Sequence, residues 1–100
     1  GEYSLEVVAV WNFEDPDAPQ YVPLAMLTAE PPQEAALLAA MKELSGVKVR
    51  RTTAQATLIA PGRWEVRVMW EREAYGPETN EYVYEVVGGE VLPRRWIRHR

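Results

Sequence analysis

Apolar residues recur at every second position in three stretches of the chain, which is the spacing of a β-strand with one buried face. The first stretch spans residues 3–11 and the most regular spans residues 64–71, where Trp and Val alternate with Glu, Arg and Met. A third stretch begins at residue 82 and continues to residue 86. We therefore expect strands at these three places.

Two further strands are predicted from residue type and turn chemistry. β-Branched residues are frequent in residues 47–60, which we expect to form an extended, bulged strand that ends at the Pro-Gly turn of residues 61–62. Residues 90–92 follow a Gly-Gly turn at residues 88–89 and predict a short strand.

The remaining segments predict connections and one edge strand. Residues 21–27 are interpreted as a short strand that Pro23 restricts to the edge of a sheet, because proline cannot donate a ladder hydrogen bond. Residues 12–20 and 74–80 contain Pro, Asn, Asp or Gly and predict loops.

The clearest helix signal lies in residues 32–45. Two prolines at residues 31–32 suit the first helical turn, where their missing N–H groups have no partner to lose, and Gly46 supplies the left-handed residue that ends a helix. The apolar side chains fall on one face, which we expect to enter the core: Leu37, Leu38, Met41 and Leu44.

The order of these elements predicts the α+β class, with one main helix packed on a curved antiparallel sheet of about four to six strands. One hundred residues are enough for one core, so residues 1–100 are expected to form a single domain. The predicted core comprises the inward positions of the strands and the apolar stripe of the helix: Leu5, Val7, Leu37, Leu38, Met41, Leu44, Trp64, Val66, Val68, Trp70, Tyr84 and Val86.

Residues 34–92 resemble PepSY-type and, more broadly, cystatin-like domains. The resemblance is carried by the Ala-rich helix at residues 34–40, followed by the segments at 64–68, 82–86 and 89–92. It implies a noncatalytic, extracytoplasmic module with a regulatory or inhibitory role. The same outline resembles the NTF2-like roll, which implies a cone that holds a small ligand.

The composition excludes several kinds of site and says little about the compartment. The chain has no Cys, so a disulfide framework, a thiolate metal site and a Cys nucleophile are excluded. No apolar run approaches the roughly 18 to 20 residues that span a bilayer.

A first residue Gly1 predicts a processed product or an excised domain, and nine Arg against two Lys favour a GC-rich bacterial, thermophilic coding background. The resemblance alone favours an extracytoplasmic location.

No catalytic, cofactor-binding or metal-binding residues are predicted. The only histidine, His99, lies near the C-terminus, where we expect fraying rather than the fixed position that a general base requires. The acidic run at residues 14–17 lacks the Gly and the distal Glu of a calcium loop and is interpreted as an ordinary acidic loop. Carboxylates between apolar strand positions predict cross-strand ion pairs on the exposed face: Glu65, Glu71, Glu81 and Glu85.

The most unusual composition is the basic C-terminal tail, residues 94–100. The chain carries a net charge of −4, yet this tail holds four Arg and no acid, so the other 93 residues carry 7 basic and 15 acidic groups, or −8. We expect Trp96 to dock on the core as the end of the last strand, while the arginines stay solvated or pair with the acidic body, and binding of an acidic partner is the alternative. The residues predicted to bind a partner are Tyr21, Arg94, Arg95, Trp96 and Arg98.

The leading hypothesis is a noncatalytic protein-binding or regulatory module that uses the sheet face or the edge at residues 21–27 to engage another protein or another domain of its parent chain. One alternative is a small-ligand-binding or enzymatic NTF2-like roll whose pocket is lined by aromatic residues, namely Trp64, Trp70, Tyr82 and Tyr84. Another is an accessory protein that binds nucleic acid, or its machinery, through the tail. The acidic body makes nucleic acid the least favoured partner, since it repels phosphate.

Overall fold

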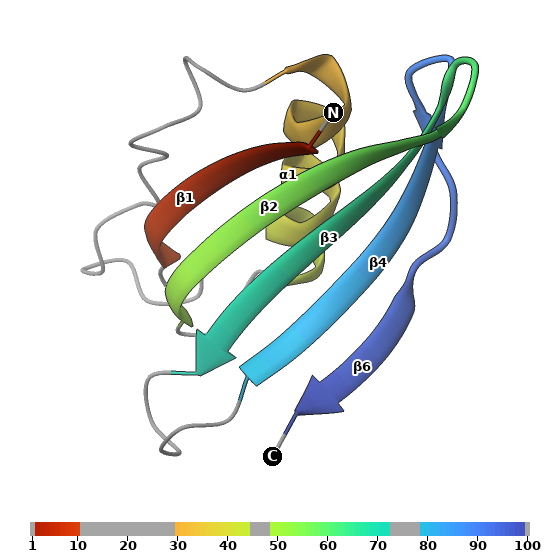
Figure 1. The fold of residues 1–100 in the computed structure, drawn as a ribbon. Helices are drawn as coiled ribbons and strands as arrows, with labels where there is room; N and C mark the ends of the chain where they lie inside the picture. Colours follow the sequence, from red (N-terminus) through yellow and green to blue (C-terminus); the bar gives the residue numbers. More distant parts are fainter. Residues whose placement is uncertain (1, 11–29, 45–48, 73–78, 100) are drawn as a thin grey trace.

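The computed structural model describes residues 2–10, 30–44, 49–72 and 79–99. These residues form one helix and six strands (Figure 1). In chain order the elements are β1 (Glu2–Val10), α1 (Pro31–Glu43), β2 (Val49–Ala60), β3 (Arg63–Arg72), β4 (Thr79–Val87), β5 (Glu90–Val91) and β6 (Arg95–His99).

Every described strand pairing is antiparallel. The strands lie in the order β1-β2-β3-β4-β5, and β6 also pairs with β4, further along the edge that β5 occupies. The sheet curves around α1, which covers one of its faces (Figure 1). The predicted α+β class, with one helix on an antiparallel sheet, is therefore confirmed.

Helix α1 starts close to its predicted position because its first turn is satisfied locally. Pro31 and Pro32 occupy the first two helical positions. The Gln33 side chain accepts a hydrogen bond from the Glu30 backbone N–H at 3.0 Å and donates one to the Ala54 carbonyl of β2 at 3.3 Å. Gln33 therefore caps the helix and ties its first turn to the sheet. Gly46, predicted to end the helix, lies outside the described residues.

The prediction that Leu38 enters the core is wrong. The buried face of α1 consists mainly of small and apolar residues on one stripe: Gln33, Ala36, Leu37, Ala40 and Leu44. Leu38 lies about 100° around the helix from Leu37, and 48% of its surface is exposed. Met41 is half-buried at the margin of the stripe. The helix contacts the sheet along a narrower stripe than its apolar residues predict.

The strand positions predicted for the core are largely confirmed. The predicted residues that are buried in the strands are Val66, Val68, Trp70, Tyr84 and Val86, and Trp64 is partly buried against them. The side chains of Leu5 and Val7 lie outside the described part of the structure, although the β1 backbone pairs with β2. Ala54 and Ala56 are fully buried opposite Val68 and Val66, and these small side chains leave room for the helix.

Two connections differ from their predicted outline. Thr79 and Asn80, predicted as the end of a loop, already belong to β4 and pair with β3 and β6. Residues 95–99, predicted as part of a basic tail that frays around His99, form β6. The predicted edge strand at residues 21–27 and the acidic loop at residues 12–20 lie outside the described residues. Within the described ranges, no helix has the length and apolar character needed to cross a membrane.

A candidate interaction surface on strand β6

Strand β6 lies at an edge of the sheet (Figure 1). It pairs with β4 in antiparallel register, with Trp96 opposite Tyr82 and Ile97 opposite Glu81. Among the described strands, no second one pairs with β6. Because side chains alternate along a strand, Trp96 and Arg98 share the face that carries α1, whereas Arg95 and Ile97 share the opposite face. We call residues 94–98 the β6 surface.

Trp96 is held firmly in place and is still exposed. Its indole packs against the edge of the Tyr82 ring, with centroids 5.9 Å apart, and lies 6.5 Å from the Trp70 ring. Its Nε1 donates a hydrogen bond to Oδ1 of the buried Asn80 at 3.0 Å. Nevertheless, 44% of Trp96 is accessible. The residue therefore docks on the margin of the core, as predicted, and also presents a fixed aromatic surface to solvent.

Two guanidinium groups stack on this aromatic cluster. The Arg98 guanidinium carbon lies 4.3 Å from the centroid of Trp96, and that of Arg94 lies 4.2 Å from Tyr82 and 5.4 Å from Trp96. Such cation–π contacts contribute about 0.5 to 1 kcal/mol at exposed sites. They also orient the arginines, so their N–H groups are displayed beside the indole.

Arg94 connects the β6 surface to the end of the helix. Its Nε donates to Oε2 of Glu43 at 2.7 Å, and the Tyr84 hydroxyl donates to the same oxygen at 2.7 Å. Burial raises the pKa of the Tyr84 phenol above its ordinary value, and the hydrogen bond to the Glu43 carboxylate raises this pKa further. Glu43 thus joins α1, β4 and the segment before β6.

The raised pKa of Tyr84 predicts a specific loss of stability at alkaline pH. Below pH 10 the phenol is protonated in both the folded and the unfolded chain, so it makes stability neither rise nor fall. Above pH 10 the unfolded phenol ionises first, and the free energy of unfolding falls by up to about 1.4 kcal/mol per pH unit. We expect Tyr84→Phe to remove this contribution.

Urea unfolding of the wild-type chain and of Tyr84→Phe between pH 8 and pH 11.5 measures this effect. The difference between the two free energies should be constant up to pH 10 and then change in favour of the variant. Two curves that stay parallel over the whole range would contradict the assignment.

A network of ion pairs crosses the opposite face of the sheet. Arg67 donates to Glu65 at 2.9 Å and to the almost buried Glu81 at 3.1 Å, which raises the pKa of the guanidinium, mainly through the hydrogen bond to Glu65. His99 Nε2 lies 3.8 Å from the same Glu81 oxygen, and Arg63 lies 3.8 Å from Glu85. The predicted cross-strand ion pairs are therefore confirmed for Glu81 and Glu85, which pair with β3. Glu65 instead pairs with Arg67 of its own strand, and Glu81 is buried rather than exposed as predicted.

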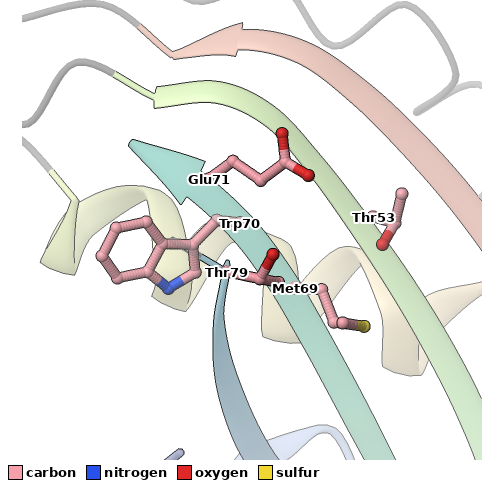
Figure 2. Close-up of a pocket in the computed structure, with 5 residues that line it drawn as sticks. All are labelled: Thr53, Met69, Trp70, Glu71 and Thr79. Carbon is pink, nitrogen blue, oxygen red and sulfur yellow. The ribbon is translucent and has the colours of Figure 1, made fainter. Parts of the chain in front are cut away.

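Two shallow depressions are formed by described residues. One, of about 150 Å³, is lined by Thr53, Met69, Trp70, Glu71 and Thr79; Figure 2 shows the Trp70 ring extending away from Met69 and Thr53. The other, of about 240 Å³, borders the β6 surface and includes Arg95, Pro93 and Leu92. Neither lining contains a His, and within the described ranges no three His, Asp or Glu residues gather as metal ligands.

The structure brings together three of the residues predicted to bind a partner. Arg94, Trp96 and Arg98 meet in one stacked cluster, whereas Arg95 lies on the opposite face of β6. Tyr21 lies outside the described residues. The residues that complete the cluster were not predicted to bind a partner, because they lie far away in the sequence: Glu43, Asn80, Tyr82 and Tyr84. Tyr82 and Tyr84 were predicted only as pocket residues of the alternative ligand-binding roll.

Sequence and structure comparisons give no relative to guide the interpretation. No family model, no curated protein and no solved structure matches the chain.

Proposed function

We propose that this protein is a noncatalytic binding module that contacts another protein, or another domain of its parent chain, through the β6 surface. The observation that carries this proposal is the state of Trp96, which is fixed by a hydrogen bond and by ring contacts and yet is 44% exposed. An aromatic residue held only for stability gains most from full burial, so its remaining exposed surface is available to a partner.

The composition of the β6 surface supports the proposal. Trp and Arg are the residue types most enriched among those that dominate binding energy at protein interfaces. Here Trp96, Arg94 and Arg98 are already stacked on one another or on Tyr82. A surface ordered before binding loses less side-chain entropy when a partner arrives, so more of its contact energy contributes to affinity.

The position of β6 at an edge of the sheet also supports the proposal that it binds a protein segment. An edge strand presents N–H and C=O groups that an incoming extended segment can pair with, and strand addition is a common mode of peptide recognition. The exposed side chains of Arg95, Trp96 and Arg98 leave both faces of the strand accessible. The β6 surface thus combines a backbone template with side chains suited to recognition.

The packing of the other aromatic residues favours a binding module over a ligand-binding roll. Trp70, Tyr82 and Tyr84 are buried, and Tyr82 makes edge-to-face contacts with both of the others, at 5.4 and 6.3 Å. Rings packed in this way fill the space that a pocket would need. A helix followed by an antiparallel meander is also the arrangement on which the resemblance to PepSY-type and cystatin-like domains rests, and a regulatory role of that kind is part of the proposal.

Display of random 12-residue peptides tests whether the β6 surface binds protein segments. Selected peptides are made synthetically and titrated into ¹⁵N-labelled protein, and shifts of the backbone amide signals locate the binding site. We expect the largest shifts at residues 94–99 and weaker binding to Trp96→Ala. Selected peptides that shift signals only elsewhere, or no selected peptides that bind in solution, would overturn the proposal.

A further inference from the structure

We infer that the segment recognised by β6 is an extended strand with the pattern acidic, apolar, apolar, acidic. This inference rests on the proposed function and names the chemistry of its partner. It follows from the order of four residues on β6, Arg95-Trp96-Ile97-Arg98, and from the strand pairing that the edge allows.

Strand pairing fixes which residues meet. In an antiparallel sheet each residue faces one residue of the added strand, with Cβ atoms about 4.5 to 5.5 Å apart, on the same face of the sheet. A segment added to β6 therefore places one side chain beside Arg98 and another beside Trp96, both on the face of the sheet that carries α1. Its intervening side chains lie beside Ile97 and Arg95 on the opposite face.

Among the described residues, no carboxylate pairs with either of the two arginines at the ends of this four-residue stretch. Within the described residues, Arg95 and Arg98 make no ion pair, and Arg98 is stacked on Trp96 with its N–H groups at the surface. By contrast, the neighbouring residues Arg94 and His99 already face acids, since Arg94 pairs with Glu43 and His99 lies beside Glu81. Two carboxylates three positions apart on the partner would form ion pairs with Arg95 and Arg98.

The middle of the stretch is apolar on both faces. Trp96 is 44% exposed on the helix face, and Ile97 is half-buried on the other. Aromatic and β-branched side chains form favourable cross-strand pairs. Antiparallel addition meets Ile97 before Trp96 and therefore requires the order acidic, aromatic, aliphatic, acidic, whereas parallel addition reverses the two middle positions. The order of the apolar pair thus reports the direction of the bound strand.

Charge argues against a second copy of the same edge as the occupant. Antiparallel pairing of two β6 strands about Ile97 would place Arg95 of each copy against His99 of the other. No acidic residue follows Glu90 in the sequence, so the β6 strand of the other copy would offer no carboxylate to Arg95 or Arg98. An acidic segment neutralises these charges, and the same arginines protect the edge from self-pairing.

Three synthetic ten-residue peptides test the inference. All have Ser flanks and blocked ends, and their central residues are Glu-Val-Tyr-Glu, Glu-Tyr-Val-Glu and Lys-Val-Tyr-Lys. Each is titrated into ¹⁵N-labelled protein at 0.05 and 0.3 M salt. We expect Glu-Tyr-Val-Glu to bind at residues 95–99 most tightly, the Lys peptide not to bind, and higher salt to weaken binding because exposed charges are screened.

Single variants locate the charges. Arg95→Ala and Arg98→Ala should each weaken binding of the Glu-Tyr-Val-Glu peptide about two- to fivefold, as expected for one cross-strand pair. Arg63→Ala is the matched control, because it removes one positive charge from a partly exposed arginine on a different strand. It should leave the affinity unchanged.

The outcomes separate the inference from the proposed function. Equal binding of the Lys and Glu peptides, or shifts confined to sites away from β6, would overturn the inference. So would tight binding at β6 by displayed peptides without the acidic pattern, although that result would support the proposed function. A single-stranded oligonucleotide that competes for β6 as well as the acidic peptide would reject an acidic protein segment as the ligand.

Discussion

Replacing Leu37 with Ala is expected to lower the free energy of unfolding by about 2 to 5 kcal/mol, the usual cost of removing a fully buried leucine side chain. Leu37 has no accessible surface and belongs to the stripe of α1 that packs on the sheet. Truncation removes apolar contacts and leaves a cavity beneath the helix. Urea unfolding at neutral pH measures the change.

Leu38→Ala is the matched control, because it makes the same substitution at the next residue of the same helix. Leu38 is 48% exposed, so the expected change is within about 1 kcal/mol. The change in helix propensity is small and equal in the two variants. Equal losses for both variants, or a larger loss for Leu38→Ala, would show that the helix is rotated about its axis relative to this structure.

The sequence predicts the strands better than the face of the helix that is buried. The alternation in residues 64–71 has the period of a β-strand and not of a helix. The predicted positions on β3 and its neighbours are buried, among them Val66 and Val68. A helix rich in Ala and Leu has apolar residues on most of its circumference. Packing against the sheet then determines which stripe of the helix is buried, because the small side chains of Ala54 and Ala56 allow the helix to approach closely. The sequence of the helix alone does not show which stripe this is.

Residues 94–100 show why the site was harder to predict than the fold. Trp96 and Ile97 are adjacent, so they lie on opposite faces of β6 and break the alternation that would have predicted a strand. Composition still identified Trp96 and its arginines as candidates for partner binding. Their arrangement depends on Glu43, which lies 51 residues before Arg94, and such distant pairings leave no signal in a single sequence.

Trp96→Ala is the second substitution with a large expected effect, about 1.5 to 3 kcal/mol of lost stability. A fully buried Trp would cost more, and the 44% exposure of Trp96 reduces the loss. The substitution removes the ring contacts with Tyr82 and Trp70 and leaves the buried Asn80 Oδ1 without its donor. An unpartnered buried acceptor costs about 1 to 3 kcal/mol by itself, and part of that cost is relieved if water enters.

Two comparisons separate the roles of this side chain. Trp96→Phe keeps an aromatic ring but not the N–H donor, so its loss of stability should be smaller and should report mainly the bond to Asn80. Arg98→Ala should change stability by no more than about 0.5 kcal/mol, because the side chain is at the surface and its one contact in the described part of the chain is the cation–π contact with Trp96. If Trp96→Ala left the unfolding curve unchanged, the indole would not hold β6 on β4. In that case the structure would not hold Trp96 in a fixed position, and the main argument for the proposed binding role of the β6 surface would be lost.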